Sequence, residues 1–427
     1  MNYPKVVYDN KRTGESYVKI KHPSGLDVLI WKMEGFSTVE ALFATKYGSV
    51  NTRFKTSDSD SYIEVPEGIA HFLEHKLFEN EDCDVFDLYA ETGASANAYT
   101  SFEQTAYTFS TSGDYKKPLE ILLSFVQKPY FTQETVDKEQ GIIAQEIKMC
   151  DDSPDRKCFF NLLKAMYKKH PVRIDIAGTV ESISHINSKL LYDCYNTFYN
   201  LHNMCLSIAG NVDEEEIIKI CDKFLIPAEN KNLQSKFEDE PFEINQKEIL
   251  ENFKVGIPLF NIGFKAPGFK GRELVKKELA ASIIMPMIFG SVSPLYKELF
   301  DEGLINSQFS YEIFDGEGFF SCICGGESND PHKVLEKCIK AVENAKKNGL
   351  DKKQFEMFKK SKYGSIIRGF NNVENCASLM MSSHFAGVDS FTLVEELANL
   401  TVEDCNDAMN IIFNTSNVSI SIIDNKS

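Results

Sequence analysis

Residues 66–78 read PEGIAHFLEHKLF, and this stretch determines how the rest of the chain is interpreted. A proline suits the first turn of a helix, and the periodicity predicts a helix over about 66–78. At about 100° per residue, the apolar side chains fall on one face and the ionisable ones on the other. The apolar set is Ile69, Phe72, Leu73 and Leu77, and the ionisable set is His71, Glu74 and His75. We expect a helix that buries its apolar face and presents two imidazoles and a carboxylate.

His71 and His75 have the spacing of a metal site, because side chains four residues apart on a helix can reach one ion. A catalytic zinc site has three protein ligands and an open position for water, whose pKa the metal lowers towards about 7. Glu74 adjoins His75 and can accept the proton of that water as the catalytic base. The alternative is a pair of surface histidines. The metal site is favoured because two of only eight histidines form the inverted zinc-peptidase pattern H-x-x-E-H.

The segment 136–147, VDKEQGIIAQEI, contains candidates for a third ligand. It is expected to be a helix, and Glu139 and Glu146 share one face because they are seven residues apart. Such a pair can supply one metal ligand and one carboxylate that supports a ligand histidine. Two glutamates on a helix are also common on a solvated surface, so the residues alone leave both interpretations open.

The H-x-x-E-H stretch with a downstream glutamate pair resembles the pitrilysin/insulinase family, the inverzincins that include the mitochondrial processing peptidases. The resemblance implies that Glu146 is the third ligand and that Glu139 is a supporting carboxylate of the catalytic site. It therefore implies one Zn²⁺ per chain, held by His71, His75 and Glu146.

The stretch 95–101, SANAYTS, is strand-like, and by itself it would be half of an ordinary hairpin. It resembles the family's edge strand beside the zinc, which pairs with the substrate backbone by β-strand addition. The resemblance implies that Asn97 and Ala98 contact the main chain of a peptide substrate.

The order of predicted elements indicates two similar halves. In each half, strand-like runs are followed by helical runs, and residues 226–252 between them are polar and lack periodicity. The ends also correspond, because Asn203–Ile208 (NMCLSI) aligns with Asn417–Ile422 (NVSISI) at an offset of 214 residues. We predict an α+β fold with two homologous α/β sandwich domains, each an antiparallel-rich sheet covered by helices. The predicted boundaries are 1–228 for the zinc-bearing domain, 229–252 for a linker and 253–427 for a domain without the motif.

The second half departs from the family pattern. Active members carry an Arg and a Tyr there that bind substrate and stabilise the tetrahedral intermediate. In this chain Phe300 and Asn306 fall at those positions, on an approximate alignment. One hypothesis is an endopeptidase subunit that a homologous partner completes, so that the chain is half of a clamshell; heterodimer and homodimer both stay open. The other is a non-catalytic scaffold subunit with a retained metal site.

Composition bears on the possible binding partners and the location of the protein. A net charge of −17 argues against nucleic-acid binding and against docking on anionic lipid. The longest apolar runs, such as 280–289, are too short to span a bilayer, so no membrane segment is expected. Eleven cysteines without a framework spacing and a polar N-terminus without an apolar core predict free thiols and a cytoplasmic location.

Overall fold

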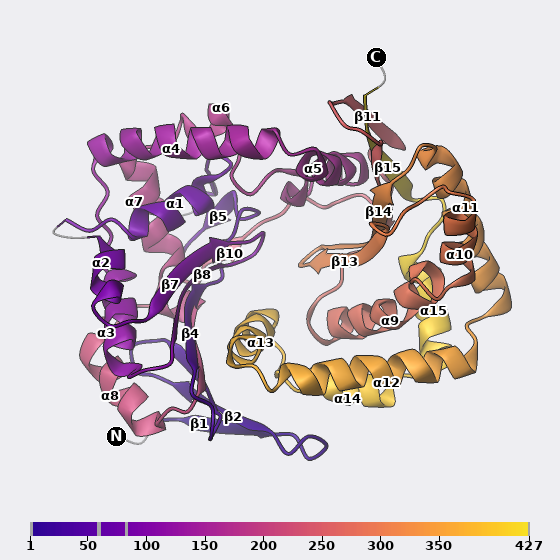
Figure 1. Cartoon of the computed structure of the whole chain (residues 1–427). Helices are drawn as coiled ribbons and strands as arrows, with labels where there is room; N and C mark the ends of the chain where they lie inside the picture. The colour runs from indigo at the N-terminus through magenta and orange to yellow at the C-terminus, as the bar shows by residue number, and fades with distance from the viewer. Residues whose placement is uncertain (1–2, 58–60, 82–83, 426–427) are drawn as a thin grey trace. The chain divides into compact units, whose positions relative to one another are not determined.

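The computed structural model describes residues 3–57, 61–81 and 84–425 (Figure 1). The chain forms two compact units. Unit 1 comprises residues 1–147, 175–237 and 367–391, and unit 2 comprises residues 148–174, 238–366 and 392–427.

Unit 1 is built on a seven-stranded sheet in the order β1-β2-β3-β9-β4-β8-β7. Neighbouring strands are antiparallel except for the parallel pair of β3 and β9. The strands are β1 (Lys5–Asp9), β2 (Ser16–Lys21), β3 (Asp27–Lys32), β4 (Val39–Thr45), β7 (Ser95–Thr100), β8 (Thr105–Thr111) and β9 (Met204–Gly210). A small sheet of β5 (Arg53–Lys55), β6 (Ile63–Glu64) and β10 (Gln234–Ser235) lies in the same unit.

Helices cover both faces of this sheet because alternate residues of each strand point to opposite faces. On β4, Val39, Ala41 and Phe43 join the main apolar core of the unit. The helices on that side are α1 (Ile69–Leu77), α2 (Val85–Ala90), α3 (Lys116–Phe125), α4 (Gln133–Asp151), α6 (Val180–Ile183), α7 (Ser188–Phe198) and α8 (Glu214–Phe224). On the other face α13 (Val373–Ala386) packs against β4 and β9, where Ser207 donates a hydrogen bond of 2.7 Å to the carbonyl of Ala377.

Unit 2 contains a five-stranded sheet in the order β11-β15-β12-β14-β13. Its strands are β11 (Glu248–Asn252), β12 (Leu259–Ala266), β13 (Ser310–Gly316), β14 (Phe319–Glu327) and β15 (Val418–Asp424). The surrounding helices are α5 (Pro154–Met166), α9 (Gly271–Phe289), α10 (Pro294–Asp301), α11 (Pro331–Asn348), α12 (Lys352–Gly369), α14 (Thr392–Asn399) and α15 (Val402–Ile412). α5 lies close to β12 and β15, and a Cβ at Gly263 would come within 2.4 Å of the Met166 sulfur.

The two sheets share one topology. The series β3, β9, β4, β8, β7 in unit 1 corresponds strand by strand to β11, β15, β12, β14, β13 in unit 2. In both, the first pair is parallel and the other pairs are antiparallel. The two stretches that align at an offset of 214 residues overlap the equivalent strands β9 and β15. The predicted α+β fold of two related halves is therefore confirmed.

The compact units differ from the predicted boundaries in two helical segments. Residues 367–391, from the second half of the sequence, belong to unit 1, and residues 148–174, from the first half, belong to unit 2. The reason is packing, because α13 covers β4 and β9 whereas α5 covers β12 and β15. The expected linker, 229–252, also contributes a strand to each unit, namely β10 and β11.

The segment Gly271–Asp301 is long and apolar enough to cross a membrane by length and composition alone. This differs from the expectation that every apolar run is too short. The segment consists of α9 and α10 with a break at 290–293, and 72% of its most apolar window is buried. Such burial is typical of a core helix, and it makes the segment weak evidence for a membrane span.

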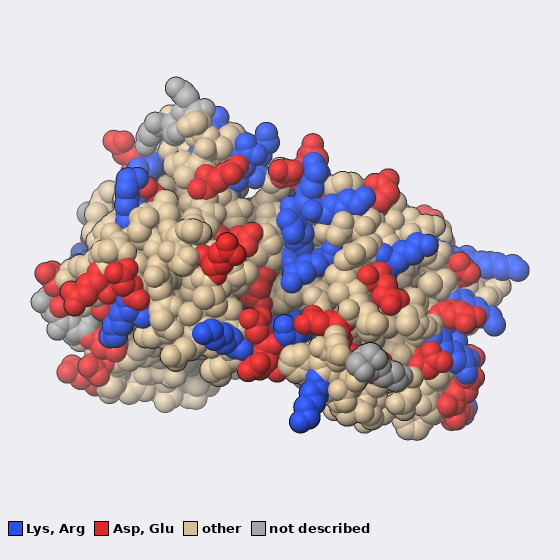
Figure 2. All heavy atoms as spheres, turned by 90° about the horizontal axis from the view of Figure 1, so that it is seen from above, with Lys and Arg blue, Asp and Glu red and all other residues tan. Residues whose placement is uncertain are grey.

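On the face shown in Figure 2, acidic and basic side chains are interspersed, so the negative charge is not one uninterrupted surface there.

Candidate metal centre

The residue before helix α1, Gly68, has a backbone conformation and surroundings that require glycine. Gly68 precedes the helix with φ of 87°, in the left-handed region that favours glycine. A Cβ at this position would lie 2.3 Å from the carbonyl oxygen of Ala177. The buried face of α1 includes Phe72 and Leu73, both with no exposed surface. The opposite face therefore has a fixed orientation and presents the ionisable residues of the motif.

Helix α4 lies beside α1 and supplies the predicted carboxylates (Figure 1). Val136, Ile143 and Ile147 of α4 are buried in the core of unit 1. Glu139 and Glu146 share another face of the helix, as their spacing predicts, and both point to α1.

Three of the predicted residues converge on one point. The Nε2 atoms of His71 and His75 each lie 3.6 Å from a carboxylate oxygen of Glu146. One ligand atom from each of the three residues lies within 4.8 Å of the other two. In a tetrahedral zinc site with bonds of 2.0–2.2 Å, ligand atoms are about 3.4 Å apart. Two imidazoles and a carboxylate at this separation fit a zinc ion in both donor type and spacing.

Glu139 contacts the Nδ1 side of the His75 ring, away from the three converging ligand atoms. The Nδ1 atom of His75 lies 3.0 Å from Oε1 of Glu139, and an ionised carboxylate only accepts hydrogen bonds, so Nδ1–H donates. The Nε2 lone pair is then available to a metal. Burial opposes protonation of His75, but Glu139, Glu74 and Glu146 outweigh it, so the pKa of this imidazole is raised in the metal-free chain. The same hydrogen bond lowers the pKa of Glu139.

Glu74 adjoins the three converging residues without being one of them. The hydroxyl of Thr100 donates a hydrogen bond of 2.8 Å to its Oε2 atom. Burial raises the pKa of Glu74, although Thr100 and His75 act in the opposite direction. A carboxylate in this position can accept a proton from a water molecule between the three converging residues. Thr100 lies within the stretch SANAYTS, but the sequence pattern did not predict a role for it.

Asn97 and Ala98 lie in β7, the last strand of the unit 1 sheet. Among the described residues no strand pairs with the outer edge of β7, and α1 packs beside it. The backbone N–H of Ala98 donates to Oδ1 of its neighbour Asn97 at 2.9 Å. The edge is therefore suited to accept another strand.

Phe300 and Asn306, at the positions where the family resemblance implies an Arg and a Tyr, make local contacts within unit 2. The Phe300 ring is half exposed and stacks on Tyr296 with centroids 6.0 Å apart. The Asn306 side chain donates to the Glu327 carboxylate. Neither side chain supplies a cation.

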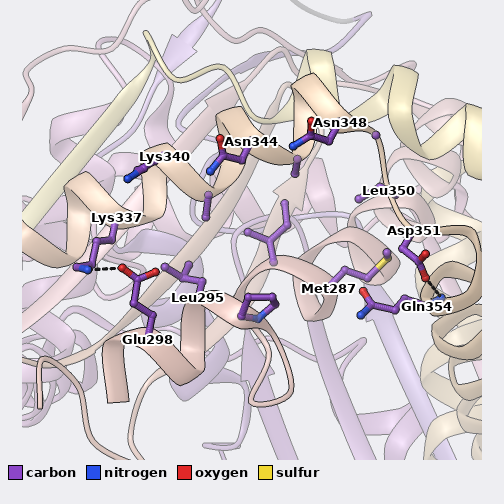
Figure 3. Close-up of a pocket in the computed structure, with 15 residues that line it drawn as sticks. Met287, Leu295, Glu298, Lys337, Lys340, Asn344, Asn348, Leu350, Asp351 and Gln354 are labelled. Atoms are coloured by element: carbon purple, nitrogen blue, oxygen red, sulfur yellow. Dashed lines mark hydrogen bonds and ion pairs between the residues drawn. The ribbon is translucent and has the colours of Figure 1, made fainter. Parts of the chain in front are cut away.

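Unit 2 also contains a cavity of about 350 Å³ between α9, α10, α11 and the start of α12 (Figure 3). Met287 and Leu295 form part of its apolar floor, and a hydrogen-bonded pair of Lys337 and Glu298 stands at its edge. Neither histidine nor cysteine lines it. Within the described part of the chain, only His71, His75 and Glu146 form a group suited to a metal, so this cavity is not part of the candidate centre.

Comparison with known proteins connects this geometry to a family. Residues 61–180 match the family model described as insulinase, peptidase family M16, and residues 185–362 match the model described as the peptidase M16 inactive domain. The uncharacterized zinc protease YmfH of Bacillus subtilis is 41% identical over 390 residues, which cover 90% of this chain and 91% of that protein.

Two further comparisons concern the fold and a known subunit. A crystal structure from Alicyclobacillus acidocaldarius, described as an M16-like peptidase, has a TM-score of 0.91 and 33% identity, and the match covers 99% of this chain and 98% of that one. The mitochondrial-processing peptidase subunit beta of Bos taurus is 32% identical over 158 residues, which cover 36% of this chain and 32% of that protein.

Proposed function

Because this chain belongs to the insulinase family of peptidases, family M16, we propose that it is a zinc-dependent endopeptidase subunit. One observation carries the proposal: ligand atoms of His71, His75 and Glu146 lie within 4.8 Å of one another, with Glu74 beside them. The names of relatives that contain the words zinc protease support zinc as the metal.

The proposed roles follow from the contacts. His71, His75 and Glu146 would hold one zinc ion, which supplies a water of lowered pKa and polarises the scissile carbonyl. Glu74 accepts the proton of that water and later donates it to the leaving amine. Glu139 orients the His75 ring through its Nδ1–H. The edge of β7 at Asn97 and Ala98 pairs with the extended peptide and places its carbonyl near Glu74.

A homologous partner subunit is part of the proposal. In this chain Phe300 and Asn306 lack the charge and the hydroxyl that would stabilise an oxyanion. The bovine relative is itself named as a subunit, which supports a division of labour between related chains. The partner is either a different chain, which the two missing groups favour, or a second copy of this one. We also propose a cytoplasmic location, supported by the nine cysteines that are buried with free thiols among the described residues.

The second candidate function is a scaffold subunit that binds peptides without cleaving them. Phe300 and Asn306 favour the scaffold function, because both side chains make local contacts and neither offers a group that would stabilise an oxyanion. The two functions make opposite predictions for hydrolysis when the partner is present.

The test is a comparison of Glu74→Gln with the unchanged chain, each with its partner. We expect near one zinc per chain in both proteins. We expect peptide hydrolysis only in the sample that contains the unchanged chain, because Gln cannot accept the proton from water. The double variant His71→Ala/His75→Ala is the control for metal binding and should lose the zinc. Full activity of Glu74→Gln would show that Glu74 is not the catalytic base. Zinc binding without any peptide cleavage by the unchanged chain would favour the scaffold function.

A further inference from the structure

We propose that Thr100 is the positioning residue for Glu74, and that β7 therefore both receives the peptide and aligns the base. This inference rests on the proposed function, because it assigns Thr100 a role through the proposed base. Its starting point is the hydrogen bond of 2.8 Å between the Thr100 hydroxyl and Oε2 of Glu74. The contact joins the exposed edge strand of the sheet to the helix that carries the metal-binding motif.

The direction of this hydrogen bond follows from the neighbours of Thr100. Thr105, on the paired strand β8, has a hydroxyl 2.8 Å from the carbonyl oxygen of Tyr47 and 3.3 Å from the Thr100 hydroxyl. A hydroxyl has one proton, and the shorter contact with a carbonyl takes it. The ionised carboxylate of Glu74 only accepts. The Thr100 hydroxyl therefore keeps its own proton for Glu74, and Thr105 faces it as a fixed, fully buried neighbour.

Thr100 is the main restraint on the base. Within the described residues, the hydrogen bond that the Glu74 carboxylate accepts at 2.8 Å comes from the hydroxyl of Thr100. With Oε2 held in this way, Oε1 is left to accept the proton of a water molecule. A carboxylate held by one residue loses its orientation when that residue loses its hydroxyl, and errors of about 1 Å in an active site can cost about 100-fold in rate.

The location of Thr100 adds a connection between binding and alignment. Among the described strands, β7 is bonded to β8 alone, and its residues are alternately exposed and half-buried. A peptide that adds to the open edge would restrain β7 from the second side. The same restraint reaches Glu74 through Thr100, so occupancy of the strand and alignment of the base become one event.

The test compares Thr100→Val, which keeps the shape of the side chain but removes the hydroxyl, with Thr100→Ser, which restores the hydroxyl. Both are measured as the zinc-loaded chain together with its partner. For Thr100→Val we expect unchanged zinc per chain, KM within about twofold and a fall in kcat of about 10- to 100-fold. Thr100→Ser should recover kcat to within about threefold. The matched control is Thr108→Val on β8, which removes a hydroxyl from the same sheet without a hydrogen bond to Glu74 and should leave kcat unchanged.

Wild-type kcat in Thr100→Val, or equal losses in both Thr100 variants, would overturn the proposal. A crystal structure of each zinc-loaded variant gives a readout that does not depend on activity. We expect the Glu74 carboxylate to leave its position or to occupy two orientations in Thr100→Val and to keep its position in Thr100→Ser. An unmoved Glu74 in Thr100→Val would overturn the positioning role, whereas zinc-loaded unchanged protein that cleaves no peptide would overturn the proposed function alone.

Discussion

At the scale of single residues, the hydrogen bonds of the buried His170 ring match those of a neutral imidazole. The backbone N–H of Val172 lies 3.2 Å from Nδ1 of His170, so this nitrogen accepts. The carbonyl oxygen of Glu317 lies 3.2 Å from Nε2, so that nitrogen donates. One donor and one acceptor describe the neutral ring, and a second proton on Nδ1 would face the N–H of Val172. Burial lowers the pKa of His170 to about 4, although the hydrogen bond to Glu317 acts in the opposite direction.

This pKa predicts a dependence of stability on pH. The unfolded chain binds a proton at His170 below about pH 6.5, whereas the folded chain does so only below about pH 4. The contribution is therefore fully present above pH 6.5 and is lost as the pH falls towards 4, by about 3 kcal/mol over the window. Urea denaturation between pH 4 and 7 should show a shallower loss of stability in His170→Gln than in the unchanged chain. The exposed His185→Gln is the control, and parallel pH profiles for all three proteins would contradict the prediction.

How much of the candidate site can be predicted from sequence depends on the sequence distance of each contact. His71, Glu74 and His75 are set by helical spacing within one stretch, and the structure brings His71 and His75 together with Glu146. Glu146 required a family resemblance, because its helix is placed by tertiary packing. The contact of Thr100 with Glu74 joins residues 26 positions apart and depends on where α1 lies along β7. Neither composition nor periodicity fixes that placement.

At the scale of elements, two short segments fix the start of α1. A Cβ at Gly68 would lie 2.3 Å from the carbonyl oxygen of Ala177, and a Cβ at Gly178 would lie 2.6 Å from the carbonyl oxygen of Glu67. Both glycines also have positive φ angles, of 87° and 73°. The segments 67–68 and 177–178 therefore approach each other backbone to backbone, and a side chain at either glycine would move α1.

We predict that Gly68→Ala lowers both stability and zinc content. The positive φ alone costs about 1–2 kcal/mol for a residue other than glycine, and the contact with Ala177 forces a further shift of the helix. Gly35→Ala is a matched control, because Gly35 has a φ of 85° but no atom within 4 Å of an added Cβ. Thermal unfolding and zinc per chain should show a loss of stability alone in Gly35→Ala and a loss of both in Gly68→Ala. Equal zinc in the two variants would contradict the role of this approach in placing the site.

The edge of β7 makes a prediction about substrates. A peptide paired with one strand donates every second N–H to that strand, while the intervening N–H groups point away. N-methylation of an amide that faces β7 should therefore weaken binding to the Glu74→Gln chain by about tenfold, close to the loss of one hydrogen bond. N-methylation of the adjacent amide is the control and should have a smaller effect. Isothermal titration with the two peptides measures the difference, and equal affinities would argue against strand addition.

Element packing also shows where sequence patterns are insufficient. Hydrophobic periodicity identifies α5 and α13 as helices with an apolar face, but it does not say which sheet that face covers. Each covers the second face of a sheet formed mainly by strands from the other half of the sequence. The sheets leave that face open because helices from their own half cover only the first one. The choice of partner sheet is thus a tertiary property, and a division of the chain by linker composition cannot detect it.

At the scale of the whole molecule, the two units have the same strand order and different site chemistry. Unit 1 retains two histidines and a glutamate at metal distance, whereas the equivalent sheet of unit 2 has no such group among the described residues. The shared strand order depends on the packing of many apolar residues. A metal site depends on three or four side chains, and a few substitutions remove it.

The same reasoning leads to a prediction about assembly. If Phe300 and Asn306 leave this chain without groups that stabilise the oxyanion, the isolated zinc-loaded chain should cleave peptides slowly. Addition of a homologous partner with the missing Arg and Tyr should raise kcat by about 100- to 1,000-fold, the usual effect of an oxyanion donor. Size-exclusion chromatography with light scattering should show a complex of two chains, and a partner in which that Arg is replaced by Ala should bind without restoring the rate. Full activity of the isolated monomer would contradict this prediction, because the chain would then supply its own oxyanion donor.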